Sequence, residues 1–275
     1  MPSSNPAFSR FGGAGNNGQQ NLGWGAPTQQ NGAPGQYGAP TQYDPYAAPS
    51  PYAATTTRYL TMDDVVTKTG ISFLVTVLAA AATWALPGDV GWALALPAVL
   101  VAFVLGLVIS FKTIANPVAT LAYGALYGVA LGAISEAFNL IYPGIVMQAL
   151  IGTFGVFAGM LVVYKTGAIR VTPKLTRWVV GAAIGALVLV LVNLVASFIT
   201  PGGLGLRDGG PLAIVFSLVV IGIAAFMLLL DFDMADEAIR RGAPAKFAWY
   251  IAFGLLVTVV WLYIEILRLL SYFRD

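Results

Sequence analysis

The sequence predicts an all-α fold, namely a polytopic membrane protein in which a bundle of seven transmembrane helices follows a disordered N-terminal tail. The first observation is composition. Of the 275 residues, 58% are hydrophobic and only 9% are charged, whereas about a quarter of the residues in a soluble domain are charged. The second observation is that long apolar stretches alternate with short polar breaks from Lys68 onward. A helix that spans a membrane needs about 20 apolar residues, which most of these stretches supply.

Residues 1–58 form the predicted tail, and residues 59–275 form the predicted transmembrane domain. Pro, Gly, Gln, Asn and Tyr dominate the tail, and the pentapeptide GAPTQ occurs twice in it. Such a segment cannot bury enough apolar surface to offset the entropy of its chain, so we expect it to be disordered.

The spans are separated by helix-breaking or polar segments. Proline restricts the residue before it and favours a break in the helix. Such breaks occur at Pro87-Gly88, Asn116-Pro117 and Pro143-Gly144. Polar segments separate the later stretches. The expected spans are about 70–86, 91–111, 117–140, 144–164, 178–200, 211–230 and 246–270.

The distribution of Lys and Arg predicts the orientation, because short cytoplasmic segments are enriched in both. If the N-terminus is inside, the external segments carry only Arg207 and Arg274, with Arg268 at a helix end. The cytoplasmic segments then hold Arg58, Lys68, Lys112, Lys165, Arg170, Lys174, Arg177, Arg240, Arg241 and Lys246. We therefore expect a cytoplasmic N-terminus and, after seven spans, an external C-terminus.

Several function classes are disfavoured by composition. The chain contains no cysteine and no histidine, which removes disulfides, thiol nucleophiles, zinc sites and histidine-based acid–base catalysis. No catalytic motif is visible, so neither an enzyme nor a resident cofactor or metal is expected. A net charge of +2 gives no sign of nucleic-acid binding. The lipid bilayer is the expected surrounding, and proton chemistry is left chiefly to carboxyl groups.

The third span carries a carboxylate on a ridge of small residues. Gly124, Gly128, Gly132 and Glu136 follow one another at intervals of four residues. Small residues at this spacing let another helix approach closely. We expect the glycines to pack helices together and Glu136 to face the protein interior.

The seventh span also carries a carboxylate on its polar side. Gly254, Thr258, Trp261 and Glu265 fall on one side of this helix. Arg268 lies one turn beyond Glu265, so a local ion pair between the two is one interpretation. A role in handling ions or protons is the other, because ionisable residues at membrane depth usually face the bundle interior or a water-filled path.

The stretch DFDMADE, residues 231–237, concentrates four carboxylates at the end of the sixth span. Its spacing does not fit a calcium-binding loop of the EF-hand type. Asp231 and Asp233 lie nearest to the apolar run and are the better site candidates. Lys112, at the inner end of the second span, is a possible charge partner at similar depth.

Three segments resemble the Bax inhibitor 1 family, also called the transmembrane BAX inhibitor motif family, and its actinobacterial branch most of all. They are YPGIVMQALIGTFGVF (142–157), LLLDFD (228–233) and AFGLLVTVVWLYIEILRLL (252–270). The resemblance covers about residues 70–275. It implies a seven-helix fold with a central last helix in the bacterial plasma membrane. It also implies a pH-sensitive calcium leak, or in other bacterial members the modulation of a membrane-bound AAA protease.

The resemblance further implies a proton-sensitive pair of carboxylates on helices 6 and 7. Asp231 and Glu265 match its positions, although Glu265 stands where the family usually has Asp. If the chain turns near residues 242–244, the two carboxylates differ in depth by roughly 15 Å. Glu136 lies closer to the depth of Glu265. The partner of Glu265 is therefore open between Asp231, Glu136 and Arg268.

Two functions follow as hypotheses. In the first, protonation of carboxylates within the membrane gates a leak of calcium or another cation, because two acids that share a buried site cannot both ionise easily. In the second, the bundle conducts no ions and regulates a membrane protein partner such as an AAA protease, with the tail or the basic segment 165–177 making the contact.

Overall fold

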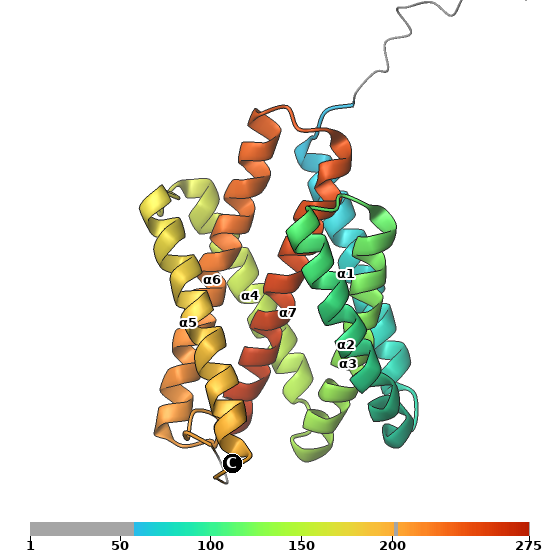
Figure 1. Cartoon of the computed structure of the whole chain (residues 1–275), viewed down its shortest axis with the longest axis vertical. Helices are drawn as coiled ribbons and strands as arrows, with labels where there is room; N and C mark the ends of the chain where they lie inside the picture. The colour runs from blue at the N-terminus through green and yellow to red at the C-terminus, as the bar shows by residue number, and fades with distance from the viewer. Residues whose placement is uncertain (1–57, 201–202, 275) are drawn as a thin grey trace, which may run out of the picture. The chain divides into compact units, whose positions relative to one another are not determined.

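The computed structural model describes residues 58–200 and 203–274. Within this part of the chain, seven helices are long and apolar enough to cross a membrane, and no strand occurs. This confirms the predicted all-α class (Figure 1). The predicted disorder of residues 1–58 falls, apart from Arg58, outside the described residues. The helices are α1 (Met62–Trp84), α2 (Gly88–Lys112), α3 (Pro117–Ile141), α4 (Ile145–Thr166), α5 (Pro173–Ser197), α6 (Pro211–Arg240) and α7 (Ala248–Tyr272).

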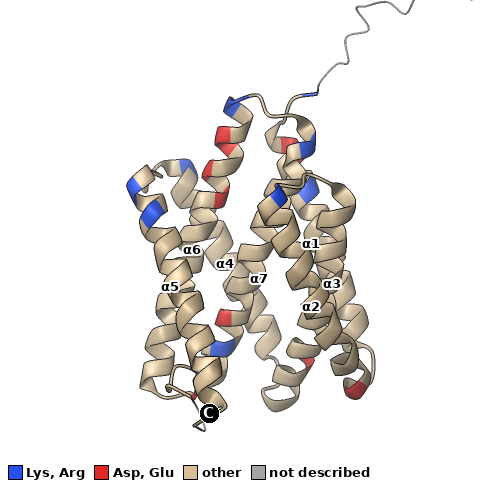
Figure 2. Cartoon of the chain, in the orientation of Figure 1, with Lys and Arg blue, Asp and Glu red and all other residues tan. Residues whose placement is uncertain are grey.

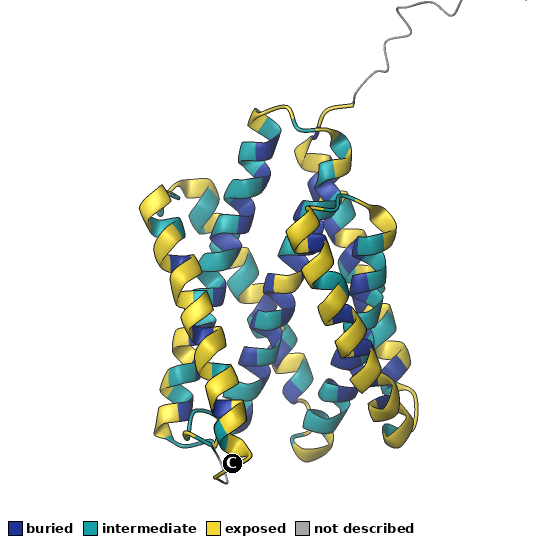
Figure 3. Ribbon diagram, in the orientation of Figure 1, coloured by how far each residue is buried: buried dark blue, intermediate teal, exposed yellow. Residues whose placement is uncertain are grey.

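The last helix, α7, is the centre of the bundle. It packs against α1, α3, α4 and α6, and buried residues recur along most of its length in Figure 3. Leu256, Leu262 and Leu267 have no exposed surface. By contrast, α5 packs mainly against α6 and exposes most of its apolar side chains. A polar group on the inner side of α7 is therefore surrounded by protein, whereas most of the apolar surface of α5 is left uncovered by the other described helices.

Several helix ends differ from those expected. The first helix begins at Met62, eight residues before the expected start at 70, because Thr61 and Asp64 form a capping box. The sixth helix continues through DFDMADE to Arg240, ten residues beyond the expected end at 230. Thr172 caps α5, which begins at Pro173 rather than 178. In each case a polar first or last turn extends beyond the apolar stretch from which the span was predicted.

Three glycines bring α3 close to α1. A methyl group on Gly124 would lie 2.8 Å from the Thr76 hydroxyl oxygen. Methyl groups on Gly128 and Gly132 would collide with backbone carbonyl oxygens of α1. The ridge of small residues seen in the sequence is thus the surface on which the two helices touch.

The start of α1 is tied to the α6–α7 connection. The Leu60 amide donates to the Ala243 carbonyl at 2.8 Å, and the Ala245 amide donates to the Arg58 carbonyl at 2.8 Å. The Lys68 ammonium donates to the Ala245 carbonyl at 2.6 Å. We call this end of the bundle the N-side and the opposite end, which carries Tyr272, the C-side. Figure 2 shows most Lys and Arg residues gathered at the N-side.

Candidate functional site

Asp231 is a buried carboxyl group at the contact between α6 and α7. Only 7% of the residue is exposed. The Thr258 hydroxyl donates to Asp231 Oδ2 at 2.6 Å and lies 3.2 Å from the Gly254 carbonyl oxygen. No Lys or Arg of the described residues forms a salt bridge with this carboxylate. Asp231 is therefore held by one neutral partner.

The single proton of the Thr258 hydroxyl links this contact to the protonation of Asp231. An ionised carboxylate can only accept, so the hydroxyl must donate to it. A protonated carboxyl can instead donate to the hydroxyl oxygen, which frees the hydroxyl proton for the Gly254 carbonyl. The α6–α7 contact can thus be made in two hydrogen-bonding arrangements, one for each protonation state.

Glu265 is more deeply buried than Asp231 and has cationic partners. Only 2% of Glu265 is exposed. Its Oε1 atom accepts from Arg268 at 3.1 Å and from Arg207 at 3.2 Å. The other carboxylate oxygen, Oε2, is buried and accepts no hydrogen bond from the described residues. The ion pair between Glu265 and Arg268, one of the two interpretations of the sequence, is thus present in the structure.

Arg207 is the partner that sequence reasoning missed, and it comes from the α5–α6 connection. Its side chain is 28% exposed and reaches inward to Glu265. Burial, followed by the charge of Arg268, lowers the pKa of Arg207 below its ordinary value. Two cations therefore share one carboxylate, which leaves a local excess of positive charge at the C-side end of α7.

Asp231 and Glu265 are not in contact. Thr258 marks the position of Asp231 along α7, and Glu265 follows it by seven residues. At 1.5 Å per residue the two positions are about 10 Å apart along the helix axis. A pair sharing one proton is thus not formed in this structure. The sequence had already indicated that the two carboxylates differ in depth. The estimate of roughly 15 Å assumed a straight α6–α7 hairpin and was larger than the separation of about 10 Å along α7.

Glu136 lies near the depth of Glu265 but faces another neighbour. The Ser135 hydroxyl and the Tyr263 hydroxyl are 2.7 Å apart, which sets α3 against α7 at this level. Ser135 therefore occupies the side of α3 that meets α7. Glu136 points to the start of α2, where a methyl group on Gly88 would lie 3.4 Å from its Oε1 atom. The positive end of the α2 dipole is a favourable neighbour for a carboxylate.

Lys112 and Asp233 do not join either site. Lys112 is exposed at the end of α2, a helix that packs chiefly on α3 and not on α6. It forms no salt bridge within the described residues, so the structure does not pair it with Asp231 or Asp233, for which the sequence made it a possible partner. Asp233 is partly exposed, because it lies two residues from Asp231 and so on a different side of α6.

Thr258 and Gly254 complete the Asp231 site from α7. Both belong to the polar stripe that the sequence showed, but the stripe gave no indication that they meet α6. Gly254 lies directly opposite Asp231, since a methyl group on it would be 3.6 Å from Asp231 Oδ1. The loop position of Arg207 left no periodic signal at all, because periodicity reports only the faces of regular elements.

A family model described as Bax inhibitor 1 like matches residues 5–275 of the chain. The match extends into the N-terminal tail, which the three segments that resemble the family had left outside. A search of curated proteins finds no match. Since the family match covers nearly all 275 residues, the chain belongs to the Bax inhibitor 1 like family.

Proposed function

We propose that this protein forms a pH-sensitive leak pathway for calcium or another cation in the bacterial plasma membrane. Its N-side faces the cytoplasm, because Lys and Arg concentrate there as they do in cytoplasmic segments. Asp231 responds to protons in this proposal, and Glu265 holds the external end of the pathway. Membership of the family and the arrangement of these two carboxylates support it.

The observation that carries the proposal is the contact of Asp231 with Thr258. It joins α6 to the central helix through a carboxyl group that is buried without a cation beside it. Burying a charge in an apolar environment is costly unless the charge is paired. Groups of this kind within a membrane usually mark a route for ions or protons.

The direction of the pH effect follows from that cost. When Asp231 is protonated, the α6–α7 contact buries no charge and the helices stay together. When Asp231 is ionised, the one hydrogen bond from Thr258 offsets the cost incompletely. Separation of α6 and α7 then becomes more favourable, as does entry of water and a cation that pairs with the carboxylate. Cation flux should therefore rise as pH increases through the titration of Asp231.

The Glu265 cluster has a different role at the C-side. Its two arginines repel an approaching cation, and Glu265 is already paired with both of them. A cation that is to reach the carboxylate must displace an arginine. Arg207 belongs to a connection and not to a helix, so its displacement leaves the backbone hydrogen bonds of the bundle intact. We assign Arg207 the role of a barrier to cations at the external end of the pathway.

The test is calcium flux into proteoliposomes that contain the full chain and an internal calcium indicator, measured over a pH series. Wild-type flux should increase with pH. Asp231→Asn, which keeps a neutral group in place, should give a low flux at every pH. Asp233→Asn removes a neighbouring carboxylate outside the contact and should keep the wild-type profile.

Two outcomes would overturn the proposal. An unchanged pH profile in Asp231→Asn would remove Asp231 as the responsive group. A wild-type protein that passes no cations at any pH would exclude the leak itself. In that case the protein would instead act as a non-transporting regulator, and chemical crosslinking in native membranes should recover a stoichiometric protein partner.

A further inference from the structure

The turn between α4 and α5 is a concentrated basic surface. We call residues 165–178 the basic turn. Its four cations are Lys165, Arg170, Lys174 and Arg177. The chain has no acidic residue between Glu136 and Asp208. None of the four forms a salt bridge with another described residue. The positive charge of this turn is therefore not neutralised by the part of the chain that the structure describes.

The other basic side chains at the N-side are more often paired. Arg240 lies 3.2 Å from Glu237, and Arg241 lies 2.7 Å from the same residue. Arg58 and Lys68 both meet Asp64. These four residues act within the fold. The contrast indicates that the cations of the basic turn are available to a group outside the described helices.

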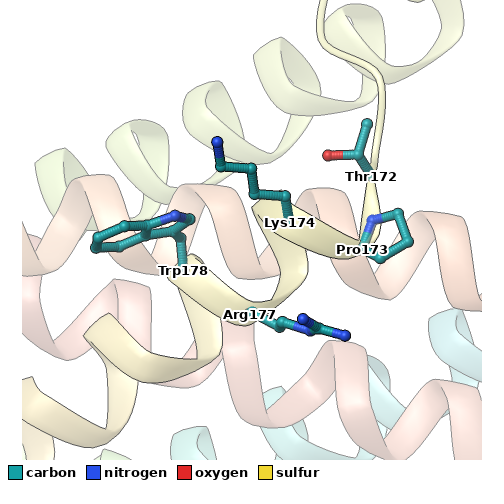
Figure 4. Close-up of a pocket in the computed structure, with 5 residues that line it drawn as sticks. All are labelled: Thr172, Pro173, Lys174, Arg177 and Trp178. Carbon is teal, nitrogen blue, oxygen red and sulfur yellow. The ribbon is translucent and has the colours of Figure 1, made fainter.

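The first two turns of α5 shape this charge into a hollow. The hollow is lined by Thr172, Pro173, Lys174, Arg177 and Trp178. Figure 4 shows Lys174 and Trp178 extending to the same side of α5, with Arg177 on another side. The Thr172 hydroxyl caps the helix by accepting from the Leu175 amide at 3.2 Å. The Thr172 cap and Pro173 fix the backbone at the start of α5. The positive end of the helix dipole adds to the charges of the lysine and the arginine.

The surroundings of the hollow favour a lipid as its partner. Trp178 is 72% exposed and is followed directly by the apolar stretch of α5. An exposed tryptophan at such a boundary is typical of the level of lipid headgroups. Because α5 packs mainly on α6 within the described part of the chain, the rest of its circumference is open to lipid in a membrane. The group that meets Lys174 and Arg177 in a membrane is thus a headgroup.

We propose that Lys174, Arg177 and Trp178 form a binding site for the phosphate of an anionic phospholipid. The Lys174 ammonium would bind the phosphate oxygens, while Trp178 on the same side of α5 (Figure 4) would lie along the glycerol and the first part of an acyl chain. Arg177, which extends from another side of the helix (Figure 4), would add its positive charge to the attraction. Basic clusters next to a transmembrane helix bind anionic lipids through such contacts. The site is independent of any ion conduction by the bundle.

The experiment is native mass spectrometry of the full chain in detergent, titrated with phosphatidylglycerol. The variant Lys174→Gln/Arg177→Gln should bind it about 30-fold more weakly, because each cation near a membrane surface contributes about a factor of five. The matched control is Lys112→Gln/Lys246→Gln, which removes two exposed cations from the same side of the bundle. The control should change binding by less than about threefold. Trp178→Ala should reduce binding of the lipid but not its dependence on salt.

Four results would contradict the proposal. Equal losses in the double variant and its control would show attraction by net charge and no site. Equal binding of phosphatidylcholine would exclude recognition of negative charge. If inorganic phosphate at the same concentration displaces phosphatidylglycerol, the site recognises the phosphate group and not the rest of the lipid. Loss of a crosslinked protein partner in the double variant, with lipid binding unchanged, would instead assign the basic turn to a protein.

Discussion

Two buried carboxylates lie at the polar side of α7, Asp231 opposite it on α6 and Glu265 on α7 itself, and their hydrogen-bond partners differ in charge. Asp231 meets one neutral hydroxyl, that of Thr258, near the N-side half of the helix. Glu265 meets two guanidinium groups, from Arg207 and Arg268, near the C-side. Both residues are less than a tenth exposed, so burial does not distinguish them.

The difference indicates that the partner, and not the degree of burial, distinguishes what the two carboxylates can do. A carboxylate between two arginines is compensated, and its removal leaves two cations without their partner. A carboxyl group opposite a hydroxyl can be neutral or ionised with the same neighbours, at different cost. The first arrangement suits a structural lock, and the second suits a response to protons.

The largest expected effect comes from removing the compensated charge. Glu265→Gln leaves Arg207 and Arg268 facing each other across a site with little solvent. Breaking a buried pair in this way costs about 3–5 kcal/mol, and the lower figure applies because both arginines keep some solvent contact. The measurement is the free energy of unfolding of the full chain in detergent micelles. Asp231→Asn, the matched control, should cost no more than about 1.5 kcal/mol, because Thr258 retains a partner.

A double-mutant cycle sharpens this prediction. Arg207→Gln and Glu265→Gln should be non-additive by about 1–3 kcal/mol, since each change alone removes the partner of the other. Additive losses would show that the α5–α6 connection does not hold Glu265. A larger loss in Asp231→Asn than in Glu265→Gln would reverse the assignment of the two sites.

An intermediate effect is expected at the hydroxyl that faces Asp231. Thr258→Val keeps the shape of the side chain but leaves the carboxyl without its partner, at a cost of about 1–3 kcal/mol in unfolding free energy. Thr258→Ser keeps the hydroxyl and should therefore retain most of the unfolding free energy that Thr258→Val loses. Because the two sites are about 10 Å apart along α7, the losses in Thr258→Val and Glu265→Gln should add. Strong coupling between them would mean that the sites act as one.

The smallest effect is expected at Gly254. A methyl group there would lie 3.6 Å from Asp231 and 3.7 Å from Met234, both ordinary contact distances. Gly254→Ala should therefore change the unfolding free energy by less than about 1 kcal/mol, with the helix propensity of alanine acting in its favour. Gly128→Ala is the contrasting variant, because its methyl group would collide with the Thr76 carbonyl, and it should cost about 1–3 kcal/mol. Equal losses in the two variants would show that the Asp231 site is packed as tightly as the α1–α3 contact.

Apolar length and proline breaks were sufficient to predict the seven helices, because a membrane span is a local property of the sequence. The polar ends of the helices were harder to predict than their apolar parts. Thr61 and Asp64 extend α1 beyond its apolar stretch, and the acidic residues 231–237 continue α6. Hydropathy does not register a helix whose polar end projects beyond the apolar stretch, whereas capping residues do.

Sequence reasoning named Asp231 and Glu265 as candidates, but of the partners that the structure gives them it named only Arg268. Glu265 and Arg268 are one turn apart on one helix, so their contact follows from helical geometry alone. Glu136 lies near the depth of Glu265, but its neighbour Ser135 occupies the side that faces α7. Arg207 could not be placed, because the position of a loop side chain depends on how α5 and α6 are joined to the bundle.

The most direct test of the difference between the two carboxylates is infrared difference spectroscopy of the full chain in lipid, recorded between two pH values. The carbonyl stretching band of a protonated carboxylic acid reports which group takes up the proton. We expect a pH-dependent band that is lost in Asp231→Asn, retained in Glu265→Gln and shifted in Thr258→Val. A band that survives in Asp231→Asn and disappears in Glu265→Gln would contradict the division of roles between the neutral and the salt-bridged carboxylate.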